Sequence, residues 1–293
     1  MKLEIRMVFR DDVERKLRRD KQIAQSFDID NAGSEWYDSR ADFLDAVFAA
    51  TRDTSGIRVY VDVSLNTHET MSVQYFEVAA RKLLKVSDKV QRKNDAYMAS
   101  LAPMRTSAHS RITVRDKILL KHIKLKGSEI GSMEFGEGYV CSKDLSQLFV
   151  NAGFTGYVQF PVCDAETEQV RDDYVLIGAG NILPPLEPDE TILPTEYASS
   201  DDLYYRRQGL TSYAGEAMRT FCDFNLTAES YREDDNGLLV VSKAVRQLCI
   251  EHKIRGIGFT PILTRPSELY TTHLDRFAIL GEKLNVNPAN KLL

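Results

Sequence analysis

The sequence predicts an α+β fold in two lobes, and two observations support this prediction. Residues 140–162 recur without a gap as residues 240–262. Between these copies, four of the nine prolines fall in one segment, ILPPLEPDETILPTEY. Because proline fixes φ and removes a backbone donor, neither a helix nor a central strand can continue through that segment. We therefore expect an N-terminal lobe (1–183), a linker (184–195) and a C-terminal lobe (196–293), each lobe containing one copy.

The N-terminal part of the chain predicts alternating strands and helices. Its first residues alternate apolar and charged side chains, as in a strand with one buried face. From Asp11 the apolar residues follow one helical face, and Ser39 begins a second predicted helix. Residues 56–65 form the clearest predicted strand, and one long helix is predicted from Thr67 to Val90. The apolar residues expected on these first and last helices are Val13, Leu17, Ala24, Phe27, Val73, Phe76, Ala80, Leu83 and Val90.

The two copies share seven of 23 residues, and their patterns predict a strand, a helix and a second strand. Average residue usage would give roughly one or two identities in a single register. A serine suited to N-capping precedes each helix, a glycine follows it, and a proline ends the second strand. Gly153, placed as a helix C-cap, is replaced by Lys253 in the second copy. The residues assigned to the shared roles are Ser142, Gly156 and Pro161 in the first copy and Ser242, Gly256 and Pro261 in the second.

The shared serine and the lysine that follows it allow two interpretations. They could form a symmetric functional site, or they could be a helix cap and a solvated side chain of the first helical turn. Serine is among the preferred N-cap residues, so the sequence favours the second interpretation. Cys249 aligns with Phe149 on the apolar helix face, which predicts a buried thiol.

The sequence contains no pattern that predicts a metal site, a cofactor or a catalytic residue set. Asp28, Asp30 and Gly33 match three positions of a calcium loop, but Ala32 and Ser39 stand where ligands are required. The glycines between 127 and 138 lack the Gly-Lys-Ser/Thr of a phosphate loop. The five histidines show no metal-binding spacing, and no nucleophile motif occurs.

The cysteines and the apolar runs predict a cytoplasmic protein. Its four cysteines are far apart and show no disulfide framework, which suits free thiols in a reducing compartment. No signal peptide or apolar stretch long enough for a membrane span is present in this sequence.

Charge gives weak guidance about partners. There are 38 basic and 43 acidic residues, a net charge of −5, which does not favour nucleic acid. The basic stretch 111–126 carries no interleaved aromatic residue that could stack on bases, so a solvated face is the better interpretation. Acidic clusters flank the second copy and are the surface that we expect to meet a basic partner. These residues are Asp201, Asp202, Glu233, Asp234 and Asp235.

The second copy also resembles part of a known group of proteins. The segment LLVVSKAVRQLCIEHKIRGIGFTPI contains an apolar strand, a serine, an amphipathic helix, a glycine and a short strand. In this order it resembles the end of bacterial polymorphic-toxin immunity proteins, including the double-CxxCG-motif group. FNLTAESYREDDNG and YFEVAARKLLKVSD are also similar to members, but the paired CxxCG motifs are absent, so no zinc ribbon is expected. The resemblance implies a cytoplasmic protein that neutralises a cognate toxin by binding it, and it transfers no contact residue.

Three functions therefore stand as hypotheses. The leading one is a non-catalytic immunity-type protein that binds a protein toxin. The second is an enzyme whose site assembles from scattered residues, and the third is a regulatory or nucleic-acid-binding module that uses residues 111–126. The candidates for the scattered site are Cys163, His109, His273, Asp62 and Glu69.

Overall fold

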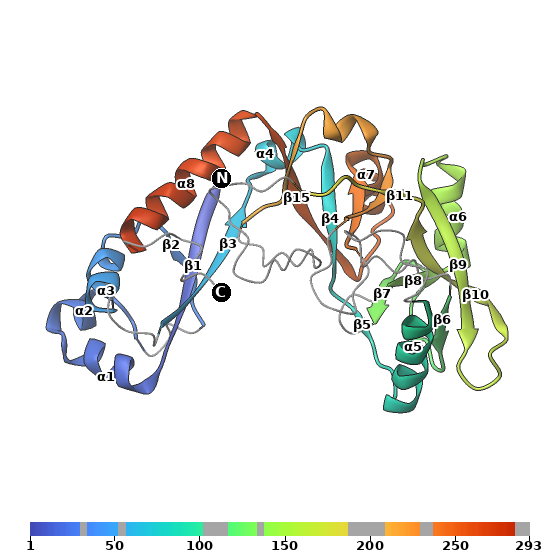
Figure 1. Ribbon diagram of the computed structural model, residues 1–293, viewed down its shortest axis with the longest axis horizontal. Helices are drawn as coiled ribbons and strands as arrows, with labels where there is room; N and C mark the ends of the chain where they lie inside the picture. Colours follow the sequence, from blue (N-terminus) through green and yellow to red (C-terminus); the bar gives the residue numbers. More distant parts are fainter. Residues whose placement is uncertain are drawn as a thin grey trace.

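The chain folds into three β-sheets with helices packed against them, so the predicted α+β class is confirmed (Figure 1). The structure is a computed structural model. The residues it describes are 1–29, 34–51, 57–101, 117–133, 138–186, 209–228 and 237–284.

The first sheet is antiparallel and has three strands in the order β2-β1-β3. β1 (Lys2–Phe9) is central, between β2 (Tyr37–Asp38) and β3 (Ile57–Ser64). Every second side chain of β1 enters the core, as the alternation predicts. The bounds of β3 also agree with the strand predicted for residues 56–65.

Helices cover one face of this first sheet, and one of them comes from the far end of the chain. Apolar side chains of the sheet and the helices form one buried cluster that includes Phe277 and Leu280 of the last helix. Figure 1 shows this last helix, α8, in red beside β1 in blue. The predicted C-terminal lobe is therefore not separate from the N-terminal one. The helices are α1 (Asp11–Arg19), α2 (Lys21–Ser26), α3 (Phe43–Thr51) and α8 (Glu268–Leu284).

The structure corrects two helix predictions in this region. The helical pattern from Asp11 is broken at Asp20, whose carboxylate accepts hydrogen bonds from the amides of Gln22 and Ile23 and caps α2. Ala24, expected in the core, is exposed, while Ile23 is buried. The second helix does not begin at Ser39.

Ser39 is instead buried next to the first sheet. Its amide donates to the carbonyl of Leu3, and α3 begins four residues later, at Phe43. The serine therefore extends the pairing between β2 and β1 and does not cap a helix.

The long helix predicted from Thr67 to Val90 is wrong. Phe76, Glu77 and Val78 are consecutive and all buried, because their strand is central in a sheet that is covered on both faces. Such a strand has no polar side, so its apolar pattern cannot be distinguished from a helix by periodicity. The segment contains α4 (Thr67–Ser72), β4 (Tyr75–Ala80), β5 (Leu83–Leu84) and the start of α5 (Asp88–Leu101).

The other two sheets have the same pattern of strand directions, and five of their six strands occupy equivalent places in chain order. The remaining strand is β10 in one sheet, where it comes last along the chain, and β4 in the other, where it comes first. One has the order β5-β7-β8-β10-β9-β6 and the other β11-β13-β14-β4-β15-β12. In both sheets the outermost pairs are parallel and the inner pairs antiparallel. The remaining strands are β6 (Ile118–Leu120), β7 (Ile130–Met133), β8 (Tyr139–Ser142), β9 (Tyr157–Asp164), β10 (Val170–Ala179), β11 (Asn181–Ile182), β12 (Ser212–Ala214), β13 (Phe224–Leu226), β14 (Leu239–Ser242) and β15 (Ile257–Arg265).

The chain crosses between these two sheets at equivalent places. β4 belongs to the sheet of β13–β15, and β5, which follows it, belongs to the sheet of β7–β10. Later β10 is followed by β11, which returns the chain to the sheet of β4. The predicted division at residues 184–195 therefore does not separate the sheets, because a strand from residues 75–80 is central in the second one.

Each sequence copy forms a strand, a helix and a strand, with one correction. The first copy is β8, α6 (Lys143–Asn151) and β9, and the second is β14, α7 (Lys243–Glu251) and β15. Pro161 and Pro261 do not end their strands, which continue for several residues. At each proline the strand has a neighbour on one side only, since pairing with β6 begins at Val162 and pairing with β12 at Leu263. A proline whose nitrogen faces the unpaired side removes no ladder hydrogen bond.

The two six-stranded sheets share one buried core. Phe149 of α6, a helix that packs on β8 and β10, lies edge-on to Phe224 of β13 in the other sheet, with ring centroids 5.4 Å apart. Tyr157 of β9 also contacts Phe224, at 4.8 Å. The same cluster includes Cys249 of α7 and Phe76 of β4. Helices and strands from both sheets therefore exclude water together.

The shared glycines lie where each unit meets the other sheet. Gly156 and Gly256 have φ of 73° and 91°, a left-handed conformation that glycine adopts without strain. A Cβ on Gly156 would lie 2.3 Å from the carbonyl oxygen of Phe224, and one on Gly256 would lie 1.9 Å from that of Ile130. Both distances are far below van der Waals contact, so only glycine fits. These contacts explain why this residue is shared by the two copies.

Backbone hydrogen bonds reinforce these two contacts. The Gly180 amide donates to the carbonyl of Gly156, and the Arg81 amide donates to that of Gly256, both at 2.8 Å. Gly180 directly follows β10 and Arg81 directly follows β4. Each turn therefore holds the chain at the place where it crosses between the sheets.

Gly153 and Lys253 show that a left-handed residue alone does not require glycine here. Their φ values are 69° and 53°, so both end their helices in the same conformation. No atom lies within 4 Å of a Cβ built on Gly153. The side chain of Lys253 is accordingly accommodated in the second copy, at a conformational cost of about 1 kcal/mol.

We predict that Gly256→Ala destabilises the protein much more than Gly153→Ala. The first variant combines backbone strain with a clash against the Ile130 carbonyl, and it should lower the free energy of unfolding by more than about 3 kcal/mol. The second should cost about 1 kcal/mol, since it adds strain alone. Urea unfolding followed by circular dichroism measures both. Equal losses would contradict the role assigned to the contact between sheets.

Candidate functional site

The predicted partner-binding acids lie outside the described residues. Asp201 and Asp202 fall between the described ranges 138–186 and 209–228, and Glu233, Asp234 and Asp235 fall between 209–228 and 237–284. Their role in meeting a basic partner stays a prediction.

Ser142 and Ser242 cap the helices that follow them. Ser142 Oγ accepts a hydrogen bond from the Leu145 amide at 3.2 Å, and Ser242 Oγ accepts one from the Val245 amide at 3.3 Å. The helix-cap interpretation therefore accounts for the shared serine in both copies. Lys243 is exposed, and its ammonium donates to the carbonyl of Met71.

Asp223 connects the two copies at the beginning of α7. Its carboxylate accepts hydrogen bonds from Ser242 Oγ at 2.6 Å and from the Thr155 amide and hydroxyl at 2.9 and 2.8 Å. Burial alone would raise the pKa of the Asp223 carboxyl. The hydrogen bonds outweigh burial because they favour the charged form, and they hold this pKa below its usual value of 3.8.

A groove of about 760 Å³ opens beside this cluster, and residues of the second sequence copy form part of its lining. Ser242, Lys243 and Gln247 contribute polar groups to the lining, and Tyr75 and Met218 contribute apolar surface. A groove of this size can hold a small molecule or the side chains of a protein partner. Its hydroxyl and carboxylate are engaged in the cap and the Asp223 cluster, so they are positioned for structure and not for a nucleophilic attack.

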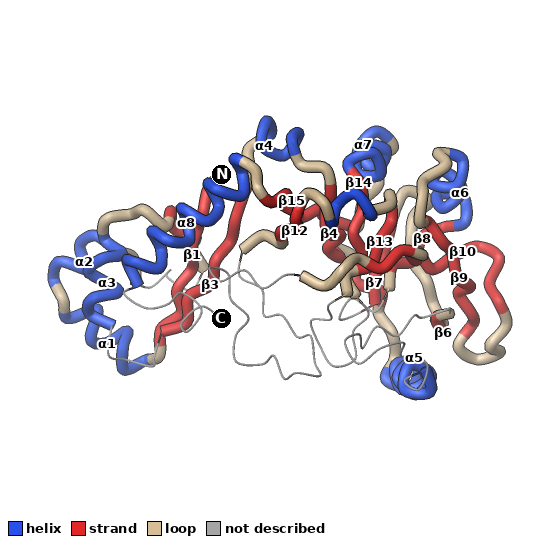
Figure 2. Tube along the Cα trace, turned by 45° about the horizontal axis from the view of Figure 1, so that its top comes forward, coloured by secondary structure: helices blue, strands red, loops and turns tan. Residues whose placement is uncertain are grey.

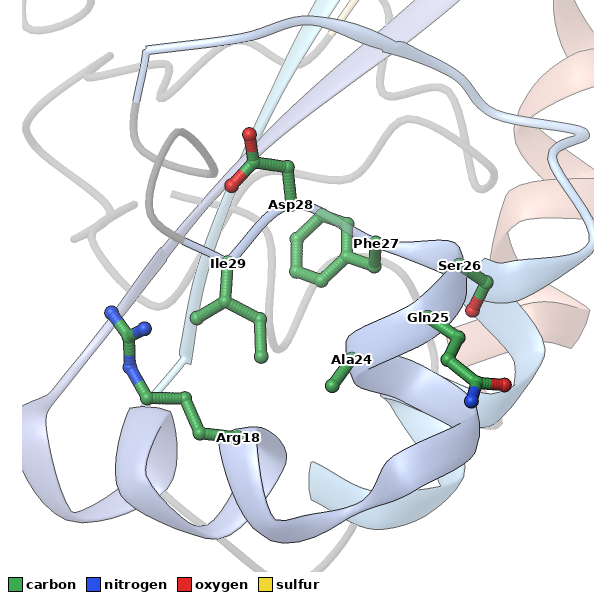
Figure 3. Close-up of a pocket in the computed structure, with 7 residues that line it drawn as sticks. All are labelled: Arg18, Ala24, Gln25, Ser26, Phe27, Asp28 and Ile29. Carbon is green, nitrogen blue, oxygen red and sulfur yellow. The ribbon is translucent and has the colours of Figure 1, made fainter.

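A second hollow, of about 500 Å³, lies at the end of α2 (Figure 3). Figure 3 shows the charged groups of Asp28 and Arg18 on its rim, with Ile29 between them. Arg18 already pairs with Glu14, and Phe27 and Ile29 belong to the buried core of the first sheet. Asp28 is the first position of the calcium-loop match. Asp30 and Gly33, the other two residues that match the calcium loop, lie outside the described residues.

The scattered enzyme candidates occupy separate environments. Cys163 is 4 % exposed and packs with Val90 and Leu119. His273 is fully buried in α8, and its Nε2 accepts the Leu210 amide at 3.0 Å.

The two acidic candidates are Glu69 and Asp62, and the Glu69 carboxylate has a structural role. The Glu69 carboxylate accepts the Asn66 amide in the capping box of α4 and pairs with the N-terminal ammonium. Asp62 lies on β3, and His109 lies outside the described residues. The four described candidates are thus not brought together.

In the described part of the basic stretch, residues 117–126, two of the four lysines have described side-chain partners. Ile118 and Leu120 are buried in β6, which is an edge strand of its sheet. Lys121 forms an ion pair with Glu166 at 2.5 Å, and Lys117 lies over the ring of Tyr97 at 4.7 Å. These contacts favour the interpretation of a solvated face over a phosphate-binding surface.

Among the described residues, no three histidine, cysteine, aspartate or glutamate side chains gather as they would to share a metal ion. None of the described helices combines the length and the apolar character needed to cross a membrane. Comparison with protein-family models gives no match, and comparison with curated proteins gives none either.

We predict that Asp223→Ala lowers the free energy of unfolding by about 1–3 kcal/mol at neutral pH, because it removes hydrogen bonds to a charged acceptor. The folded pKa is lowered, so this contribution is complete above pH 3.8 and is lost as the pH falls below that value. Urea unfolding at both pH ranges measures it.

Asp172→Ala, which removes an exposed carboxylate of β10, is the control and should change little. A wild-type advantage over Asp223→Ala that stays constant as the pH falls well below 3.8 would contradict this account.

We also predict that one thiol reacts ahead of the others. Cys222 is half-buried, whereas Cys141, Cys163 and Cys249 are at most 4 % exposed. Burial raises the pKa of the Cys141 and Cys249 thiols to about 12, so few thiolates are available there. Maleimide labelling of the folded protein, read by peptide mass spectrometry, should modify Cys222 first. Early labelling of Cys249 would contradict its assignment to the core.

Proposed function

We propose that this protein is a cytoplasmic, immunity-type protein that binds a cognate protein toxin and neutralises it without catalysing a reaction. The proposal begins from the resemblance of residues 238–262 to such proteins. In the fold this segment supplies β14, α7 and β15, together with part of the lining of the groove. An inhibitor needs a complementary surface rather than a nucleophile.

The observation that carries the proposal is that exposed residues on α6 have exposed counterparts at equivalent positions on α7. Most residues shared by the two copies have a structural role as a cap, a turn or a core contact. Lys143 and Lys243, by contrast, are exposed at equivalent positions. Val150 is 42 % exposed, and its equivalent Ile250 is 50 % exposed. Packing within the protein does not require an aliphatic side chain at either place.

Gln147 and Gln247, also shared, complete the exposed stripe of each helix. The Gln147 amide donates to Asn151 and the Gln247 amide donates to Glu251, both at 2.9 Å. Each helix therefore presents an ordered glutamine and an aliphatic residue to solvent beside an exposed lysine, and the Lys243 ammonium also donates to the Met71 carbonyl. Aliphatic surface surrounded by ordered polar groups is the composition expected of a protein contact.

The two helices are close enough to act as one surface. Both lie on the same side of the paired sheets in Figures 1 and 2. The Asp223 carboxylate ties Thr155, just beyond α6, to Ser242 at the start of α7. The matching pattern of strand directions in their sheets supports the further view that both units derive from one duplicated unit, which would give a partner two similar helices to bind.

The test is binding and neutralisation of the toxin domain encoded beside this chain. The wild-type chain should bind that domain in calorimetry and restore growth of cells that express it. Val150→Asp combined with Ile250→Asp should weaken binding about tenfold or more, since each charge would be buried at the contact. Val170→Asp is the matched control, because Val170 is 61 % exposed on β10, away from these helices.

A wild-type chain that neither binds nor neutralises the neighbouring toxin would overturn the proposal. Binding that survives the double substitution would instead exclude the α6 and α7 surface and leave the neutralising activity in place.

A further inference from the structure

The uncovered face of the first sheet carries an arginine held between two aromatic rings. The Arg6 guanidinium carbon lies 4.8 Å from the ring centre of Tyr60 and 5.2 Å from that of Trp36. Arg6 and Tyr60 are opposite each other on β1 and β3. Because Leu3, Ile5 and Met7 face the helices, Arg6 must face the other side.

This face is open to solvent in the described structure. Figure 2 shows α1, α2, α3 and α8 gathered on the opposite side of β1 and β3. Trp36, the single tryptophan of the chain, is 41 % exposed, and Val8 is 38 % exposed. Large apolar groups are therefore presented together with the stacked cation.

Arg6 is unpaired among the described residues, although carboxylates are near. Glu4 pairs with Lys2 at 2.6 Å, and Asp38 pairs with Arg40 at 2.8 Å. Asp62, the remaining carboxylate of this face, forms no described ion pair with Arg6. The Arg6 Nε is buried and has no hydrogen-bond partner. The two rings are thus the described contacts that stabilise this charge.

Such an arginine is prepared to receive a carboxylate. Stacking fixes the planar guanidinium, so little side-chain entropy remains to be lost when a partner binds. Its terminal nitrogens can donate two parallel hydrogen bonds to one carboxylate. Tryptophan, tyrosine and arginine are also the residues most enriched at the centres of protein contacts.

We propose that Trp36, Arg6 and Tyr60 form a docking site for an acidic segment of a protein partner, with a carboxylate on Arg6 and an apolar side chain against Trp36. The occupant is defined by charge complementarity, since Arg6 is the unpaired cation among the side chains of this face that the structure describes. The site does not depend on the toxin proposal, because its residues come from the first sheet and not from the duplicated units.

The test uses Trp36 as its own reporter in the full-length chain. A short synthetic peptide of glutamates with interspersed leucines is titrated while tryptophan emission is recorded. The emission should change with saturation, and the apparent affinity should fall at high salt because the contact is ionic. The same peptide with glutamine in place of glutamate should bind about tenfold more weakly or worse.

Variants assign the effect to Arg6. Arg6→Ala should lower the affinity for the glutamate peptide about tenfold or more. Arg6→Lys should keep only part of that affinity, because lysine lacks the planar, two-pronged guanidinium. Arg15→Ala, on the solvent side of α1, is the control and should bind like the wild type. Far-ultraviolet circular dichroism checks that each variant is folded.

An unchanged wild-type emission, or equal binding by Arg6→Ala and Arg15→Ala, would overturn the proposal. Equal binding of the glutamate and glutamine peptides would overturn it as well, since it would remove the carboxylate from the contact. Failure of the neighbouring toxin to bind would leave these outcomes unaffected.

Discussion

The close approach of two turns to the backbone of the opposite sheet is the constraint on which the larger part of the fold depends. At Gly156 and Gly256 the chain turns in a left-handed conformation, directly against a carbonyl of the other sheet. A side chain at either place would push the sheets apart. The same turns accept the amides of Gly180 and Arg81, where the chain leaves one sheet for the other. The shared core containing Phe149 and Phe224 can close only because these turns are so tight.

The sequence predicts the local elements well where a segment has one buried face. β1, β3 and the strand–helix–strand units have clear periodicity, and their positions agree with the structure. Prediction fails at β4, because a strand buried on both faces loses its alternation. It fails again for the two lobes, since the return of α8 to the first sheet and the crossing of β4 depend on contacts between distant segments. No local pattern in a single sequence specifies such pairings.

The candidate surfaces show the same limit. The duplication draws attention to Ser142 and Ser242, which turn out to be helix caps, while the exposed Val150 and Ile250 look unremarkable in the sequence. Arg6 lies on β1, Tyr60 on β3 and Trp36 just before β2, so no sequence spacing connects them. The one signal in the sequence is that Trp36 is its single tryptophan. A binding surface is assembled from geometry, so its residues become visible only when the strands are paired. This is the physical reason why function was harder to predict than fold class.

The central claim of the account is that the two six-stranded sheets form one cooperative body, joined by reciprocal contacts at the glycine turns. Amide hydrogen exchange tests it most directly. The amides of Ile130 and Phe224 donate to the carbonyls of Arg255 and Thr155, next to the glycine turns of the facing sheet. They should exchange as slowly as the amides within β4 and β10, and all should open in one common unfolding event. Rapid exchange of these bridging amides while both sheets stay protected would contradict the account.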